Sequence, residues 1–532
     1  MIARSASGVL GAGLGLLALA ACQSLADERS ATSADLIITG GTVFDGTGAE
    51  GRLADLVIDK GRIQYIGRDA AARFKAKRLV EAAGLIVAPG FIDPHTHADD
   101  EIASDDAKER ANLAFAMQGV TTVMLGNDGY GTPDIAAQAE EVLTQGIGTN
   151  IAYLAGFGPI REAALGKDNR APDPAELEQM KALARSAMCE GAWGLSAGLY
   201  YAPQNYAATQ EVVEIASVAG AMGGYFDTHM RDESTYNITV TGAVKEALEI
   251  GRRAQIPVHI SHIKALGPAV WGDSAKMIAL IEAAQAKGQR VTADQYPWAA
   301  SGTRISNALV PRWALAGGLA ALRERLDDPA EAARIREGMI EGLARRGGAE
   351  KLLVTGILED APVTLGQTLA QTAEAMQLEP VDAAIAILRA GDARVASFNM
   401  AERDIAAFAR QDWVVTGSDG STGHPRKYAS FPKAYRDLVT NGGMSLAHFI
   451  RRSSGATADL IGLTDRGYLK PGLAGDVVIF DADQFAPRAT YEQPTRYSVG
   501  VRHLIVNGTA LITDGEHTGA LPGQPLLKDT SC

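Results

Sequence analysis

Cysteine is scarce in this sequence, with three residues in a chain of 532: Cys22, Cys189 and Cys532. So few thiols do not provide the disulfide framework of a small secreted domain. A bridge between Cys189 and Cys532 can be drawn but is not expected, because Cys532 is the last residue and Cys189 lies in a helical pattern. The sequence therefore predicts a fold that does not depend on disulfides.

The sequence also lacks any block rich in lysine and arginine. Its 50 basic and 63 acidic side chains give a formal net charge of -13. A nucleic-acid-binding domain normally carries a basic patch, so this composition argues against a nucleic-acid partner. With 46% hydrophobic and 21% charged residues, the chain has the composition of a globular protein and is long enough for one large and one small domain.

Long apolar runs are missing apart from Val9 to Ala21, which follows Arg4 and is too short for an ordinary spanning helix. It ends in Leu-Ala-Ala-Cys22, which resembles a bacterial lipobox and implies cleavage before Cys22 and lipidation there. Gln23 follows where aspartate would indicate the inner membrane. We expect a signal peptide at 1–22, a tether at 23–33 and a periplasmic protein held by its lipid at the outer membrane. That lipid would be its sole membrane contact. The alternative is a plain secretory signal.

The mature chain is predicted to contain two domains. Short strands with turn signals occur near both ends, so 34–90 and 464–532 are expected to form one small β-sandwich. Residues 91–463 alternate short apolar strands with helical patterns, and eight such strands predict an α/β fold, a (β/α)8 TIM-like barrel. The long interval at about 299–362 is predicted to be an insertion that forms a lid or binding wall, or else a solvated decoration.

Candidate metal ligands stand where the predicted barrel strands end. His95 and His97 are two residues apart, so on a strand they point to the same side. Other predicted strand ends carry Asp128, His229, His262 and Asp419. These side chains converge if the sheet closes, which predicts a metal site, although imidazoles alone suit Zn, Fe and Ni. Asp419 can relay a proton; otherwise it caps a helix. His259 points away from His262 and is expected to pack rather than to ligate.

Several sequence motifs around these candidate ligands match those of a known family. The chain resembles the amidohydrolase superfamily and, within it, the N-acyl-D-amino-acid deacylase (D-aminoacylase) family. The matching stretches are Ala88-Pro-Gly-Phe-Ile-Asp-Pro-His-Thr-His97, Gly119-Val-Thr-Thr-Val, Gly191-Ala-Trp-Gly-Leu-Ser, His229-Met-Arg-Asp-Glu, Ile260-Ser-His-Ile-Lys, Asp294-Gln-Tyr-Pro, Ser418-Asp-Gly and His424-Pro-Arg. They occur in the family's order over nearly the whole chain after the tether.

The resemblance implies a metal centre with one or two zinc ions. His229 and His262 would hold the tighter ion, while His95, His97 and Asp419 would surround a weaker position. Asp128 stands where the family normally has cysteine. Because a carboxylate is a harder ligand than a thiolate, it also accepts Mn or Fe and could bridge two ions. Asp128 could instead contact the ligands from outside the coordination sphere.

The resemblance also implies roles in substrate binding and turnover. Asp419 would act as general base and acid, and Tyr201 would polarise the scissile carbonyl. Lys264 and Tyr296 match positions that clamp the substrate carboxylate, and Arg426 is assigned to the rim of this site. One further carboxylate contact is missing, because Gly302 stands where the family has serine.

The predicted activity is cleavage of the linear amide of N-acyl-D-amino acids by metal-hydroxide attack, which yields a carboxylate and a free D-amino acid. The alternatives are a dipeptidase or another amide hydrolase on the same scaffold, with a dipeptide substrate, and a catalytically dead, lipid-anchored binding protein. The retained ligand set argues against the last of these.

Overall fold

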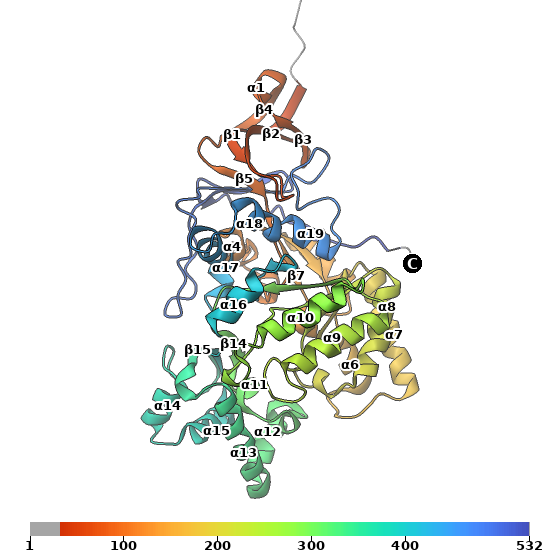
Figure 1. The fold of residues 1–532 in the computed structure, drawn as a ribbon, viewed down its shortest axis with the longest axis vertical. Coiled ribbons are helices and arrows are strands. Elements are labelled where there is room, and N and C mark those ends of the chain that lie inside the picture. Colours follow the sequence, from red (N-terminus) through yellow and green to blue (C-terminus); the bar gives the residue numbers. More distant parts are fainter. Residues whose placement is uncertain (1–31, 531) are drawn as a thin grey trace, which may run out of the picture.

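The protein is described by a computed structural model that covers residues 32–530 and 532. The expected signal peptide and nearly all of the expected tether lie outside these residues. Figure 1 shows a small β domain at one end of the long axis, a barrel in the middle and a helical insertion at the other end. Within the described ranges, no helix is both long and apolar enough to cross a membrane.

The small domain is built from both ends of the chain, as predicted, and is hydrogen bonded as one nine-stranded sheet. Its order is β21-β20-β19-β18-β5-β1-β2-β3, with β4 paired to β1. The strands are β1 (Thr32–Val43), β2 (Arg52–Asp59), β3 (Arg62–Gly67), β4 (Phe74–Glu81), β5 (Ile86–Pro89), β18 (Val477–Phe480), β19 (Val501–Val506), β20 (Thr509–Thr513) and β21 (Glu516–His517). The two ends meet where β18 pairs antiparallel with β5. The short helix α1 (Ala70–Arg73) lies between β3 and β4.

Eight parallel strands form the barrel, which confirms the predicted architecture. They are β6 (Phe91–Asp93), β7 (Val120–Leu125), β8 (Asn150–Tyr153) with its continuation β9 (Ala155–Gly156), β10 (Gly194–Gly198), β11 (Tyr225–His229), β12 (Val258–Ile260), β13 (Val291–Gln295) and β17 (Val414–Thr416). Two hydrogen-bonded groups of strands are joined where Trp193 N donates to Tyr153 O at 2.9 Å. The ring closes where His97 N donates to Gly420 O at 3.0 Å. The carboxyl ends of all the strands therefore face one mouth.

Helices surround the barrel between its strands. They are α2 (Asp99–Ile102), α3 (Ala107–Arg110), α4 (Leu113–Ala116), α5 (Ile135–Gln145), α6 (Phe157–Leu165), α7 (Pro174–Cys189), α8 (Thr209–Ala221), α9 (Val240–Ala254), α10 (Ser274–Gln285), α16 (Glu402–Ala409), α17 (Arg426–Ala434), α18 (Leu446–Ser453) and α19 (Gly455–Ile461). Helix α9 buries Ala243, Val244, Ala247 and Ile250 at helical spacing, so one apolar face covers the strands. Helix α7 begins with a capping box at Asp173.

The insertion after β13 is longer than predicted. Strand β16 (Gly391–Ser397) pairs with both β14 (Ser301–Arg304) and β15 (Leu352–Glu359). The helices are α11 (Ile305–Leu309), α12 (Gly318–Asp327), α13 (Pro329–Arg345), α14 (Leu369–Met376) and α15 (Pro380–Ala390). They share a separate apolar core with this three-stranded sheet. The predicted limit of 299–362 is therefore too short, because the strand that completes the insertion returns only at 391.

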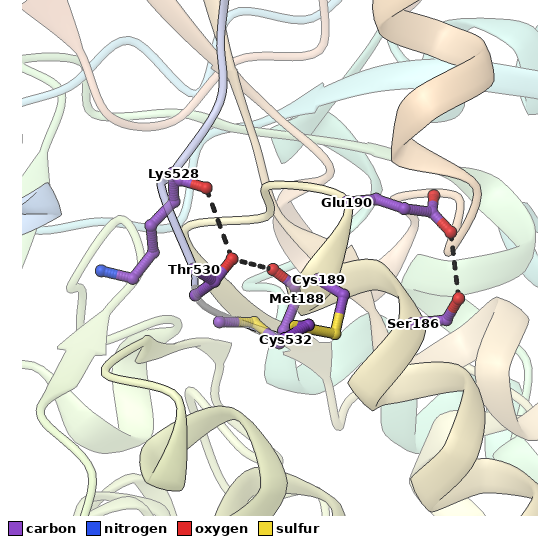
Figure 2. The surroundings of a disulfide bond; sticks show 7 residues. All are labelled: Ser186, Met188, Cys189, Glu190, Lys528, Thr530 and Cys532. Carbon is purple, nitrogen blue, oxygen red and sulfur yellow. Dashed lines mark hydrogen bonds between the residues drawn. A yellow bond between two sulfur atoms is a disulfide. The ribbon is translucent and has the colours of Figure 1, made fainter.

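The C-terminal tail corrects two predictions. Strand β22 (Pro525–Leu526) leaves the small domain and pairs with β8, so the end of the predicted segment 464–532 belongs to the barrel. This path carries Cys532 back to the end of α7, where it forms a disulfide with Cys189. Figure 2 shows the tail at this point, where Thr530 Oγ1 donates to Met188 O at 2.7 Å. The expectation of no bridge was wrong, because β22 brings together residues 343 positions apart.

Candidate metal centre and substrate cavity

The structure brings together all six predicted metal ligands at the carboxyl ends of the barrel strands. His95 and His97 follow β6, Asp128 follows β7, and His229 is the last residue of β11. The other two, His262 and Asp419, lie two and three residues after the ends of β12 and β17. Five of these residues line a cavity of about 400 Å³, and His95 is fully buried beneath it. The strand-end positions thus converge as the sequence predicted.

Three of these residues have a left-handed backbone conformation. The φ angles are 56° at Asp128, 37° at His262 and 47° at Asp419. A residue with a side chain adopts this region at a cost of order ~1 kcal/mol or more, and such strain gathers at functional sites. Close packing contributes at Asp128, since a Cβ on the neighbouring Gly198 would lie 2.2 Å from the Asp128 carbonyl oxygen. The local fold therefore aims these side chains inward against their backbone preference.

Asp128 lies at the centre of the cluster. Its Oδ1 is 3.3 Å from His262 Nε2, 3.5 Å from His95 Nε2 and 3.6 Å from His229 Nδ1. Its other oxygen, Oδ2, is 3.5 Å from His97 Nε2. The two oxygens thus face different histidines, which is the arrangement that a bridging carboxylate needs.

The donor atoms of this cluster fit a metal ion. Three groups have ligand atoms within 4.8 Å of one another: His95, His262 and Asp419; His95, His97 and Asp128; and Asp128, His229 and His262. His95 Nε2 and Asp128 Oδ1 are buried and have no hydrogen-bond partner among the described residues. Burial lowers the pKa of His95 to about 3, so its imidazole is neutral and its lone pair is available. Imidazole nitrogens and carboxylate oxygens are the donors with which proteins bind zinc.

Asp419 is paired with Arg426 as well as facing the histidines. Arg426 Nη2 donates to Asp419 Oδ1 at 2.8 Å, and Nη1 lies 2.6 Å from Oδ2. Asp419 Oδ1 also lies 3.4 Å from His97 Nε2. Burial alone would raise the pKa of Asp419, but the Arg426 guanidinium and the nearby histidines hold it below its ordinary value. Asp419 is therefore an ionised carboxylate that can accept a proton.

Glu233 is a buried carboxylate behind the cluster to which the sequence analysis gave no role. It lies 3.3 Å from His262 Nδ1 and 3.7 Å from His229 Nε2, on the ring sides opposite to the Asp128 contacts. Burial would raise the pKa of Glu233, but Lys264 and the two histidines hold it below its ordinary value. A carboxylate in this position fixes the orientation of metal-binding imidazoles. Its signal was its place four residues after His229, at the end of a matched motif.

The predicted substrate-binding residues have different surroundings. Lys264 lines the cavity, and its Nζ donates to Glu233 Oε1 at 2.6 Å. Tyr201 also lines the cavity, and burial raises the pKa of its phenol well above the ordinary value, so it stays a hydrogen-bond donor. Tyr296 is buried under the Arg426 guanidinium, 4.8 Å from its ring centre, and its hydroxyl faces Met400 Sδ at 3.7 Å. Tyr296 therefore supports Arg426 and does not line the cavity.

His259 packs as predicted. Its Nε2 lies 3.1 Å from Asp294 Oδ1 and its Nδ1 lies 3.0 Å from Thr292 Oγ1. Asp294 Oδ1 in turn accepts a hydrogen bond from the His262 backbone N–H at 2.8 Å. His259 thus helps to hold the loop that carries a predicted ligand.

The insertion forms one wall of the cavity, so it is more than a surface decoration. The lining residues it contributes include Gly302, Arg304, Asn307, Arg346 and Arg394. Arg346 donates to Tyr200 Oη at 3.3 Å. These arginines could not be assigned from the sequence, because their common location depends on strand pairing within the insertion.

Comparison with known proteins agrees with this geometry. Residues 78–512 match the amidohydrolase family. The chain belongs to the amidohydrolase family. It is 31% identical over 524 residues to a D-aminoacylase of Alcaligenes xylosoxydans xylosoxydans, an alignment that covers 93% of this chain and 98% of that one. The predicted family and enzyme class are confirmed.

Two solved structures extend the likeness to three dimensions. One is the N-acyl-D-glutamate deacylase of Bordetella bronchiseptica, complexed with zinc and a phosphonate that mimics the tetrahedral intermediate; it is 30% identical, with a TM-score of 0.78. The other is a D-aminoacylase described as having a binuclear metal centre, 31% identical with a TM-score of 0.79. Each match covers 93% of this chain and 100% of the solved chain. The amidohydrolase fold is thus shared over 93% of this chain.

Proposed function

We propose that this amidohydrolase hydrolyses the linear amide of N-acyl-D-amino acids and releases a carboxylic acid and a free D-amino acid. One observation carries the proposal: an ionised carboxylate, Asp419, and a protonated phenol, Tyr201, line the same cavity as the histidine cluster. The related chains, which are named as deacylases of N-acyl-D-amino acids, support this choice of substrate.

The residues fit one or two zinc ions: His229, His262 and Asp128 would hold one ion, and His95, His97 and Asp419 would surround a second position. When bound, zinc supplies Lewis-acid activation of water and of the amide carbonyl. A carboxylate in place of the family's cysteine also suits Mn or Fe. The remaining chemistry belongs to the side chains of the cavity.

Asp419 takes the proton of the attacking water on Oδ1 or Oδ2 and passes it to the nitrogen of the leaving amine. This transfer is needed because an amine leaves a linear amide poorly unless it is protonated. Tyr201 donates a hydrogen bond to the carbonyl oxygen, where negative charge develops. Lys264 lies beside Glu233, and Arg426 lies beside Asp419. These two cations are proposed to bind the substrate carboxylate. Each is already held by its ion pair, so the clamp is preorganised.

Amino-acid release from a substrate panel tests this function. Zinc-loaded protein is incubated with N-acetyl forms of D- and L-leucine and of D- and L-glutamate, and with D-alanyl dipeptides. We expect release from at least one N-acyl-D-amino acid, much slower release from its L-form, and none from the Asp419→Ala variant. Faster cleavage of dipeptides would favour a dipeptidase, and binding of zinc without cleavage of any amide would favour a dead binding protein.

We also propose that the protein is a periplasmic lipoprotein anchored through Cys22 at the outer membrane. The Cys189–Cys532 disulfide supports this location, because such bonds persist in oxidising compartments and are rare in the cytoplasm. Metabolic labelling with a fatty acid, followed by membrane fractionation, tests the proposal. We expect label on the wild-type chain and no label on the Cys22→Ser variant. A chain recovered unlabelled from the periplasm would support the plain secretory signal instead.

A further inference from the structure

Two arginines in the insertion wall face the cavity without anionic partners. Arg304 on β14 and Arg394 on β16 are directly opposite each other in the antiparallel pairing, and both line the cavity. Among the described residues 32–530, no carboxylate forms an ion pair with either guanidinium group, and neither side chain donates a hydrogen bond. Like charges in directly opposite positions destabilise a sheet, so the fold bears a cost for placing them together.

The other cations that line the cavity each contact a polar side chain of the protein. Lys264 is paired with Glu233, Arg426 is paired with Asp419, and Arg346 donates to Tyr200. Burial and the neighbouring Arg304 lower the pKa of Arg394, while Asp100 and Asp392 act in the opposite direction without closing an ion pair. Although the chain has a net charge of -13, these two guanidinium groups at the cavity wall have no ion-pair partner among the described residues.

The pair lies close to the proposed carboxylate clamp. A Cβ on Gly302 would lie 3.1 Å from Arg426 Nη2, so this part of β14 contacts the clamp. Arg304 is two residues further along the same strand, which places it on the same face and about 7 Å away along the strand. A short side chain that extends from a substrate held at Arg426 spans such a distance.

We propose that Arg304 and Arg394 bind the side-chain carboxylate of an acidic N-acyl-D-amino acid, which makes the enzyme selective for substrates with a second negative charge. Each guanidinium group presents parallel N–H donors that suit a carboxylate. A bound carboxylate would also offset the repulsion between the two positive charges. This inference rests on the proposed function. The comparisons do not decide the preferred side chain. One solved relative is named for N-acyl-D-glutamate and the other is named only as a D-aminoacylase, and the two are about equally similar to this chain.

Binding and turnover test the inference separately. Binding is measured by calorimetry on zinc-loaded protein, with the products D-glutamate and D-glutamine, and turnover with their N-acetyl forms. We expect D-glutamate to bind at least about tenfold more tightly than D-glutamine, because the two differ only in the charge of the side chain. The Arg304→Gln and Arg394→Gln variants should reduce this ratio toward one. Arg488→Gln, which removes an exposed arginine outside the cavity, should leave it unchanged.

Two outcomes overturn the inference. One is equal binding of D-glutamate and D-glutamine, and the other is a ratio that persists in both variants. Succinate and butyrate represent charged and uncharged acyl products, and their affinities are compared in the same way. If succinate binds more tightly than butyrate while D-glutamate and D-glutamine bind equally, the arginines recognise the acyl group and not the amino-acid side chain. Failure to hydrolyse any N-acyl-D-amino acid overturns the proposed function, while the binding ratio still decides the role of the arginine pair.

Discussion

Arg426 and Asp419 form a two-point ion pair at the mouth of the barrel, with nitrogen–oxygen distances of 2.6 and 2.8 Å. Both side chains are buried, so the pair is weakly screened by solvent. It aims the Asp419 carboxylate toward His97 and keeps it ionised. The residue proposed to move the proton is thus held in place by a residue proposed to bind the substrate.

Replacing Asp419 with asparagine keeps the shape of the side chain but removes its ability to accept and donate the proton. We expect kcat to fall by about 10²- to 10⁴-fold, the range typical of general acid–base catalysis. Steady-state kinetics measures the loss, and circular dichroism with metal analysis shows whether the variant is folded and loaded. Near-normal turnover in the folded, metal-loaded variant would remove Asp419 from its proposed role.

The pH profile should depend on Arg426. A carboxyl group whose pKa is depressed stays ionised as the pH falls, until the pH reaches that lower value. In Arg426→Gln the guanidinium is lost, the pKa of Asp419 rises, and the carboxylate is protonated at higher pH. We therefore expect the acid limb of the kcat/KM profile to move to higher pH, together with a larger KM. An acid limb at the wild-type position would show that Arg426 does not set the ionisation of Asp419.

The metal content should depend on Asp128. Because its two oxygens face different histidines, Asp128→Ala should lower the number of bound ions, as measured by elemental analysis after dialysis. Asp128→Cys should retain zinc but discriminate more strongly against Mn, since thiolate is the softer ligand. Unchanged stoichiometry in Asp128→Ala would place this carboxylate outside the coordination sphere.

Glu233 should act through the histidines it contacts. We expect Glu233→Gln to weaken zinc binding by about 10- to 100-fold, as removal of such a partner typically does. Competition with a chromogenic chelator measures the affinity directly, without reference to turnover. Glu211→Gln is the matched control, because Glu211 is a buried glutamate paired with Arg161 outside the cavity lining. Equal losses of zinc affinity in both variants would indicate a general effect on stability.

The sequence predicted the barrel and the convergence of the candidate ligands at its mouth, because both depend on local patterns. Each strand is a short apolar run, and closure of parallel strands brings their ends together whatever the loops do. His95, His229 and Asp419 could therefore be placed at one site while being far apart in the chain.

Features that depend on tertiary pairing escaped prediction. The contact of Arg426 with Asp419 follows from the turn between β17 and α17, and the opposition of Arg304 and Arg394 follows from the register of β14 on β16. Neither leaves a periodic signal in the sequence. The bridge from Cys189 to Cys532 escaped for the same reason, since a spacing of 343 residues carries no information about distance.

The Cys189–Cys532 bridge should stabilise the protein without affecting catalysis. It fastens the tail that carries β22 to the end of α7, outside the residues that line the cavity. We expect the Cys189→Ser, Cys532→Ser double variant to keep wild-type kcat/KM but to lose about 2–4 kcal/mol of the free energy of unfolding, typical of a native disulfide. Denaturant titration measures the loss, and amide hydrogen exchange should rise in residues 525–530. Reductant should reproduce both effects in the wild-type protein and have none on the double variant. Equal stability of the oxidised wild type and the double variant would show that strand pairing and the Thr530 hydrogen bond alone fix the tail.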